Sequence, residues 1–136
     1  MATQRILVDS SLIIDYFRKE IKSKSFLYKL FQQNSTLYIS TLTVYELLCG
    51  TKTAQLHKDT KKIFALFNIL EFGTIEASIA ADLYKQLKQK NLIVETVDIL
   101  IAATALSLSF PLATLNKSHF IRFNELELVD FHTRRK

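Results

Sequence analysis

Short apolar segments alternate with segments of helical periodicity along this chain. The first, Ile6-Leu7-Val8 within residues 5–8, is apolar without alternation, as in a parallel strand covered by helices on both faces. Further strand signals lie at 36–40, 68–72, 111–115 and 126–130. Strands that alternate with helices predict an α/β fold, a three-layer α/β/α domain with a mainly parallel sheet of four to five strands.

The intervening segments carry apolar residues at spacings of three and four, which predicts helices. We expect Ser10 or Ser11 to cap the first helix and Gly50 to end the helix that follows residue 40. The other predicted helices span 22–33, 54–68, 74–90 and 95–109, with a short turn or helix around His119.

Length and composition fit one domain. The chain has 136 residues, of which 49% are hydrophobic and 23% charged, so we expect a single domain over 1–136 with a basic tail at about 132–136. No apolar run reaches the ~18 residues of a membrane span, and the N-terminus does not read as a signal peptide. With one cysteine, Cys49, no internal disulfide can form, and a cytoplasmic location is expected.

The net charge of +5 favours a polyanionic partner such as nucleic acid, although many small proteins share such an excess. The basic residues at 58–62 and at the C-terminus also fit a solvated helix face and a frayed tail. Two glycines are too few for a Gly-rich phosphate loop, which excludes nucleotide-binding folds of the dinucleotide or Walker type. Cysteine and histidine show no zinc-site spacing, and His57, His119 and His132 are expected to be structural or exposed.

Acidic and amide side chains follow the predicted strands. Asp9 comes after the first strand, Glu46 lies in the helix after the second, and Asn116 follows the strand at 111–115. Asp98 lies in the first turn of the helix at 95–109. Because sites in open α/β sheets form beyond the carboxyl ends of the strands, these residues are expected to converge. Taken singly, each also has a structural explanation as a cap, a solvated helix residue, a dipole partner or a turn former.

Three carboxylates and an amide oxygen in one cleft would repel one another strongly without a cation. Hard oxygen ligands suit Mg²⁺ or Mn²⁺. An acidic metal site on a basic α/β domain points to hydrolysis of phosphodiester bonds.

Three segments of the sequence resemble the motifs of a known family. The segments ILVDSSLIIDYF, ISTLTVYELLCG and VDILIAATALSLSFPLATLNKSHF are similar, in order and spacing, to the motifs of PIN domains, specifically the VapC-type toxin ribonucleases. The resemblance implies a Mg²⁺- or Mn²⁺-dependent endoribonuclease that acts on tRNA or another structured RNA. It assigns Asp9, Glu46 and Asp98 to the metal, with Asn116 at the fourth position.

The resemblance also implies supporting roles. Ser11 and Thr114 match small hydroxyl positions that can bond the carboxylates or bound water, whereas Asp15 is expected to be structural. His119 stands where relatives often have an acidic residue.

The family further implies a homodimer and a cognate VapB-type antitoxin that blocks the acidic cleft. Phe26, Leu27, Phe64 and Phe67 could form an interface, or they could be plain core. Two other functions stay open: a PIN-type nuclease outside any toxin pair, and a catalytically silent RNA-binding module. The presence of all three carboxylates disfavours the silent module.

Overall fold

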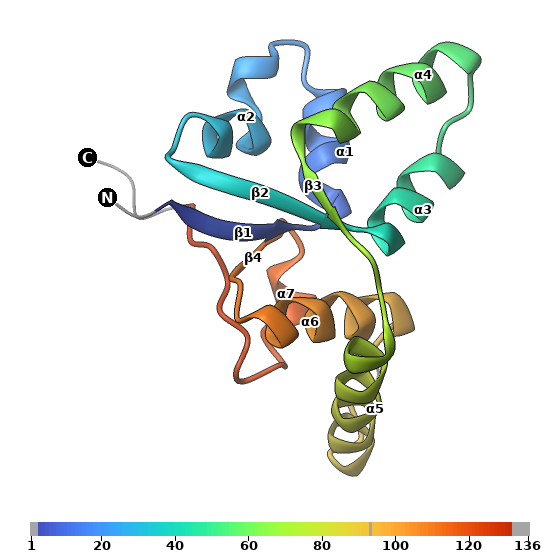
Figure 1. Cartoon of the computed structure of the whole chain (residues 1–136), viewed down its shortest axis with the longest axis vertical. Coiled ribbons are helices and arrows are strands. Elements are labelled where there is room, and N and C mark those ends of the chain that lie inside the picture. Colours follow the sequence, from blue (N-terminus) through green and yellow to red (C-terminus); the bar gives the residue numbers. More distant parts are fainter. Residues whose placement is uncertain (1–2, 93, 132–136) are drawn as a thin grey trace.

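A four-stranded parallel sheet forms the middle layer of the protein, whose computed structural model describes residues 3–92 and 94–131 (Figure 1). The strands are β1 (Gln4–Val8), β2 (Ser35–Ser40), β3 (Asn68–Leu70) and β4 (Leu112–Ala113). They lie in the order β3-β2-β1-β4, and each neighbouring pair is parallel. The predicted mainly parallel sheet is confirmed.

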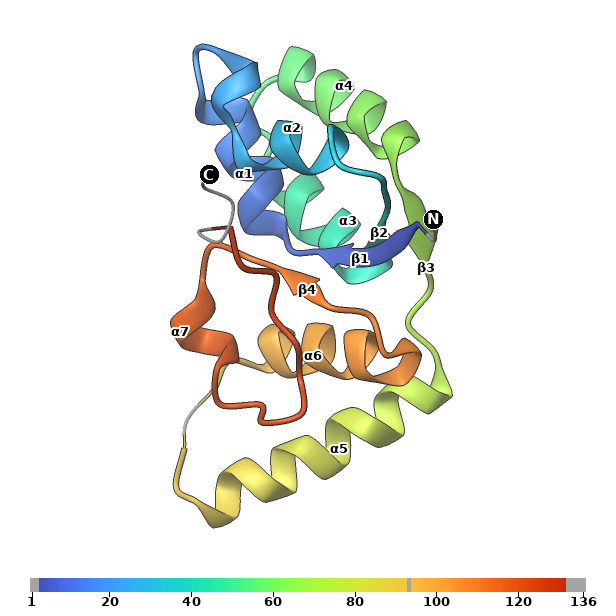
Figure 2. The ribbon, with the colours of Figure 1, turned by 90° about the vertical axis from the view of Figure 1, so that its left-hand side faces the viewer.

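Helices cover both faces of the sheet, which confirms the predicted three layers (Figure 2). One face carries α1 (Ser10–Arg18), α2 (Phe26–Phe31), α3 (Thr41–Cys49) and α4 (Ala54–Ile63), with 3₁₀ turns η1 (Lys22–Lys24) and η2 (Phe64–Leu66). The other face carries α5 (Thr74–Gln89), α6 (Thr96–Leu108) and the short α7 (Lys117–Phe120).

The central strand β1 contributes to two separate cores. Ile6 and Val8 pack into the core beneath α1–α4, whereas Leu7 packs into the core formed with α5 and α6. All three side chains are fully buried. Because successive side chains of a strand point to opposite faces, a strand buried on both faces has no polar position, which explains its uninterrupted apolar sequence.

Several element boundaries differ from the predictions. The helix predicted at 22–33 begins only at Phe26, because the Ser25 hydroxyl accepts the Tyr28 N–H at 3.2 Å and caps α2 there. The helix predicted at 54–68 ends at Ile63 and tightens into η2 before β3. The strand predicted at 126–130 is a single parallel bridge between Leu112 and Leu128.

The expected cap of the first helix is wrong. Asp9, not Ser10 or Ser11, occupies the N-cap position of α1, and its side chain makes no capping hydrogen bond. The Asp9 carboxylate instead accepts hydrogen bonds from the hydroxyls of Ser11 and Thr114. The side chain that would ordinarily cap α1 is therefore used at the end of the sheet.

Asp15 is structural, as expected. Its Oδ2 accepts the N–H of Phe26 at 3.2 Å, and its Oδ1 lies 2.9 Å from Nζ of Lys19. The side chain is 12% exposed. Asp15 therefore fastens the start of α2 to α1.

Leu27 and Phe67 are buried in the core, and Phe26 and Phe64 pack against it, so the core explanation of these four residues is the correct one. No helix in the described part of the chain is long and apolar enough to span a membrane. The basic tail predicted at about 132–136 lies outside the described residues.

Candidate acidic site at the carboxyl ends of the strands

The carboxyl ends of β1, β2 and β4 lie at one edge of the sheet, and each leads into a residue of interest. Asp9 follows the last residue of β1, and its N–H donates to the Ala113 carbonyl of β4 at 3.0 Å. Helix α3 starts directly after β2 and carries Glu46, whereas Asp98 lies in the first turn of α6. The parallel sheet thus delivers these side chains to a shared edge.

The Asp9 carboxylate is nearly buried, with 5% of the residue exposed, and is held by two hydroxyls. Ser11 Oγ donates to Asp9 Oδ2 at 3.0 Å and Thr114 Oγ1 donates to the same oxygen at 2.8 Å. Ser11 Oγ also accepts the N–H of Leu115 at 2.9 Å. The expected hydrogen bonds of Ser11 and Thr114 to a carboxylate are present, and they tie the chain after β1 to the chain after β4.

Glu46 carries a buried oxygen that lacks a partner. Among the described residues, no hydrogen bond reaches its Oε1. Burial raises the pKa of Glu46 above its ordinary value, and the charges of Asp9, Asp98 and Glu95 raise it further, although the Ser10 hydroxyl lowers it. An ionised carboxylate in this place is destabilised unless a cation or a donor approaches it.

Asp98 is paired with a histidine from another element. Its Oδ2 lies 3.2 Å from Nδ1 of His119 on α7, and the Asp98 side chain is 18% exposed. Burial raises the pKa of Asp98, His119 opposes that rise, and the negative charges of Asp9 and Glu95 add to it. The Asp98 carboxylate is therefore repelled by the neighbouring carboxylates and attracted by His119.

Asp9, Glu46 and Asp98, hereafter the acidic site, are close enough to raise the pKa values of Glu46 and Asp98 by mutual repulsion. They do not form a ready-made cage: in residues 3–92 and 94–131, no group of three or more His, Cys, Asp or Glu side chains is close enough to hold a metal ion. A cation bound by fewer direct carboxylate ligands and by water fits this spacing better than one enclosed by all three.

Asn116 is less closely tied to the acidic site. Its backbone N–H donates to Thr114 Oγ1 at 2.9 Å, but its exposed side chain makes no capping bond to α7. It lines a hollow of about 290 Å³ together with Phe26, Lys117 and Phe131. A direct part for Asn116 in the site stays a prediction.

His119 was placed at a motif position from the sequence, but its contact with Asp98 was not predicted, and Glu95 was not singled out. Glu95 is the N-cap residue of α6 and precedes Asp98 by three residues, a spacing within the first turn that could have indicated that the two carboxylates lie near each other. His119 is half exposed, as expected, but its contact with Asp98 depends on how α7 docks on α6. No sequence spacing predicts that docking.

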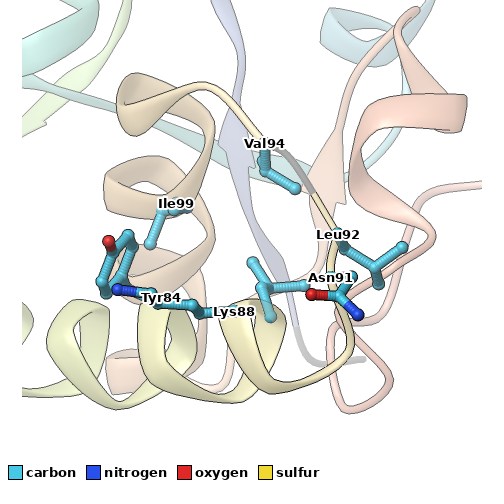
Figure 3. Close-up of a pocket in the computed structure, with 7 residues that line it drawn as sticks. Tyr84, Lys88, Asn91, Leu92, Val94 and Ile99 are labelled. Atoms are coloured by element: carbon cyan, nitrogen blue, oxygen red, sulfur yellow. The ribbon is translucent and has the colours of Figure 1, made fainter.

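An apolar groove of about 440 Å³ begins at the acidic site. Glu46 is part of its lining, together with Ile14 and Phe17 of α1 and the basic side chains Arg18 and Lys52. A second hollow, of about 460 Å³, lies between α5 and α6 near Tyr84, Lys88 and Leu92 (Figure 3). Among the described residues that line the second hollow there is no carboxylate, so none of the three residues of the acidic site belongs to its described lining.

The chain is similar to known proteins over most of its length. The PIN domain model matches residues 6–126, a range that contains the whole acidic site. The chain is 31% identical to the ribonuclease VapC of Rickettsia bellii over 91% of this chain and 94% of that protein. It is also 31% identical to the ribonuclease VapC1 of Methanocaldococcus jannaschii, over 91% of this chain and 85% of that protein.

The fold is similar to that in the crystal structure of VapBC2 from Rickettsia felis bound to a DNA fragment from their promoter. The TM-score is 0.81 at 25% identity, and the likeness covers 93% of this chain and 98% of that chain.

Proposed function

The chain belongs to the PIN-domain family and, within it, to the VapC ribonucleases, and we propose that it is a metal-dependent endoribonuclease. It acts in the cytoplasm as the toxin of a toxin–antitoxin pair and cleaves tRNA or another structured RNA. The observation that carries this proposal is the acidic site, where three carboxylates meet beyond the strand ends and one buried oxygen of Glu46 has no partner in the described residues. The net charge of +5 supports a polyanionic substrate.

Asp9, Glu46 and Asp98 are the residues that would hold Mg²⁺ or Mn²⁺. The donor set fits such an ion, because all three offer carboxylate oxygens and Glu46 Oε1 is buried without a partner in the described residues. When bound, the cation supplies a more acidic water and stabilises negative charge on the phosphate. Without it, burial and the neighbouring negative charges both disfavour ionisation, and they raise the pKa values of Glu46 and Asp98.

The chain's own groups orient the reactants. Ser11 and Thr114 hold Oδ2 of Asp9, which leaves Oδ1 as the oxygen that would face a bound cation. Asn116, two residues after Thr114, would contribute a neutral amide near the scissile phosphate. In the hydrolysis, a water oxygen bonds to phosphorus, one P–O ester bond breaks, and the leaving ribose oxygen takes up a proton.

The groove that begins at Glu46 is the proposed seat of the antitoxin. An antitoxin segment with apolar side chains would cover Ile14 and Phe17, and a basic side chain would reach Glu46. Such a segment blocks RNA from the acidic site by occupying it. We expect that mixing with the antitoxin encoded beside this chain abolishes RNA cleavage. Ile14→Asp should weaken this inhibition with little effect on the fold, because the Ile14 side chain lines the groove and is 39% exposed.

A homodimer is part of the proposal. Tyr45 on α3 and Ile75 on α5 are large side chains that are 67% and 69% exposed, and we take them as the first candidates for a dimer contact. Measuring the mass of the isolated protein in solution tests this point, and a monomer at micromolar concentration contradicts it.

The test of the central proposal is cleavage of total RNA by the purified protein. We expect discrete RNA fragments with Mg²⁺ or Mn²⁺ and none after chelation, since the cation offsets carboxylate repulsion and activates water. Cleavage that persists in chelator contradicts the metal role. RNA binding without cleavage under every divalent cation would instead indicate a silent binding module, and activity with no inhibitory partner would indicate a nuclease outside a toxin pair.

A further inference from the structure

The His119 side chain is placed by α7 against the start of α6. The adjacent Phe120 is 1% exposed and belongs to the core beneath α6, which anchors the short helix. The His119 N–H donates to the Asn116 carbonyl at 3.0 Å, which sets the turn that carries the imidazole. The ring itself is 51% exposed, so it reaches Asp98 from an anchored backbone without being part of the core.

The contact with Asp98 repeats the pattern seen at Asp9. Two hydroxyls bind Oδ2 of Asp9, and Nδ1 of His119 lies 3.2 Å from Oδ2 of Asp98. A carboxylate whose one oxygen is held by a donor cannot rotate freely, and its other oxygen then keeps a fixed direction. In each of these two aspartates, one carboxylate oxygen is thus held by side chains that are not themselves carboxylates.

The carboxylate of Asp98 has negative neighbours on one side and an imidazole on the other. Asp9 and Glu95 are the acidic residues that act on it, whereas Nδ1 of His119 lies 3.2 Å from its Oδ2. Removing the imidazole would leave Asp98 free to turn away from Asp9 and Glu95. The carboxylate would then no longer present an oxygen to the same point.

From this geometry we propose that His119 is a positioning residue, whose Nδ1–H holds Oδ2 of Asp98 so that Oδ1 would be available to a bound cation. The inference rests on the proposed function. The proposal gives His119 a role at the acidic site without making it a metal ligand. It predicts that RNA cleavage and metal binding depend on a nitrogen donor at the Nδ1 position and not on the rest of the ring.

Three substitutions separate that nitrogen from the ring. In His119→Asn the amide nitrogen can occupy the place of Nδ1, in His119→Gln it reaches the place of Nε2, and His119→Ala removes both. His57→Ala is the matched control, because His57 is a histidine whose Nδ1 contacts Thr51 Oγ1 at 3.2 Å in an exposed setting. Thermal unfolding of every variant checks that the fold is kept.

We expect His119→Ala and His119→Gln to lower kcat for RNA cleavage by about tenfold or more with little change in KM, as for other groups that orient metal ligands. His119→Asn should stay within about threefold of the unaltered protein, and His57→Ala should leave cleavage unchanged. The second readout is Mn²⁺ binding, measured by calorimetry without RNA. The Kd for Mn²⁺ should rise by about tenfold in His119→Ala and His119→Gln and should not rise in His119→Asn.

The proposal is overturned if His119→Asn falls as far as His119→Ala, or if His119→Ala matches the unaltered protein in both assays. If the unaltered protein cleaves RNA but the variants do not follow the expected order, with His119→Asn least affected, the positioning role is wrong and the proposed function stands. Mn²⁺ binding in the expected variant order without any RNA cleavage defeats the proposed function and leaves the positioning role standing. Absence of both binding and cleavage in the unaltered protein defeats both.

Discussion

Two groups of carboxylates in this protein are bonded in different ways. Asp15 and Glu76, hereafter the scaffold carboxylates, use both oxygens: Asp15 bonds Lys19 and the Phe26 N–H, while Glu76 accepts from the Gly73 N–H at 2.8 Å and the Ser107 hydroxyl at 3.3 Å. In the acidic site, the bonds to Asp9 and Asp98 fall on one oxygen each.

The difference shows which carboxylates serve the fold and which are kept for a partner. A carboxylate bonded at both oxygens already has its partners within the chain and needs no metal ion. A carboxylate bonded at one oxygen, among others of the same charge, is oriented but not neutralised. Carboxylate count or burial alone would not separate the two groups, because Asp15 is as well shielded as Asp98.

The largest expected effect is on RNA cleavage. Asp98→Asn should lower kcat/KM by about a thousandfold, because a cation at a phosphoryl site contributes several kcal/mol and each 1.36 kcal/mol is about tenfold. Asp15→Asn is the matched control, with the same chemical change in a scaffold carboxylate, and its kcat/KM should equal that of the unaltered protein. Equal losses in the two variants would contradict the division into two groups.

The second expected effect is on the free energy of unfolding, and it should appear when a scaffold carboxylate is replaced. Asp15→Ala leaves the Phe26 N–H without its acceptor and should lower the free energy of unfolding by about 1–3 kcal/mol. Urea unfolding measures it. Lys19→Ala removes only the partly exposed ion pair and should lower the free energy by less than about 1 kcal/mol. A larger loss from Lys19→Ala than from Asp15→Ala would mean that the ion pair, rather than the junction of α1 and α2, carries the stability.

The three-layer fold and the convergence of the acidic site were predictable because both follow from chain order. Parallel strands place their carboxyl ends together, which brings Asp9 after β1 and Glu46 in the helix after β2 to one edge of the sheet, whereas Asp98 comes to that edge from the start of α6. Asp15 could also be separated from Asp9, since six residues along a helix carry it away from the strand end.

The contacts made by side chains between elements were not predictable. The contact of His119 with Asp98 depends on the docking of α7, and the two hydroxyl bonds at Asp9 replaced the expected capping of α1. The start of α2 at Phe26 likewise depends on Ser25 and Asp15, which compete with an apolar pattern that runs on from residue 22. Local periodicity finds the elements, but tertiary hydrogen bonds decide their ends.

The smallest expected effect concerns how the free energy of unfolding depends on pH. We expect the contributions of Glu46, in the acidic site, and Glu76, a scaffold carboxylate, to change in opposite directions as the pH rises. The pKa of Glu46 is raised from its ordinary value of 4.5, so the folded protein binds this proton more tightly than the unfolded chain does. The stability that this provides is present below pH 4.5 and is lost as the pH rises through the raised pKa. The pKa of Glu76 is lowered from 4.5, chiefly by backbone N–H groups, so its contribution is present above that value and is lost as the pH falls.

Opposite substitution effects should therefore appear at neutral pH with chelator present. Glu46→Gln should raise the free energy of unfolding by about 0.5 kcal/mol, because it removes a repelled charge. Glu76→Gln should lower it by about 0.5 kcal/mol, because a partly exposed charge at the start of α5 stabilises the helix only modestly. Both differences should shrink at a pH well below 4.5, where the carboxyl groups of the unaltered protein are protonated. If Glu46→Gln destabilises the chelated protein at neutral pH, Glu46 belongs with the scaffold carboxylates, and the cation would be held by the two aspartates alone.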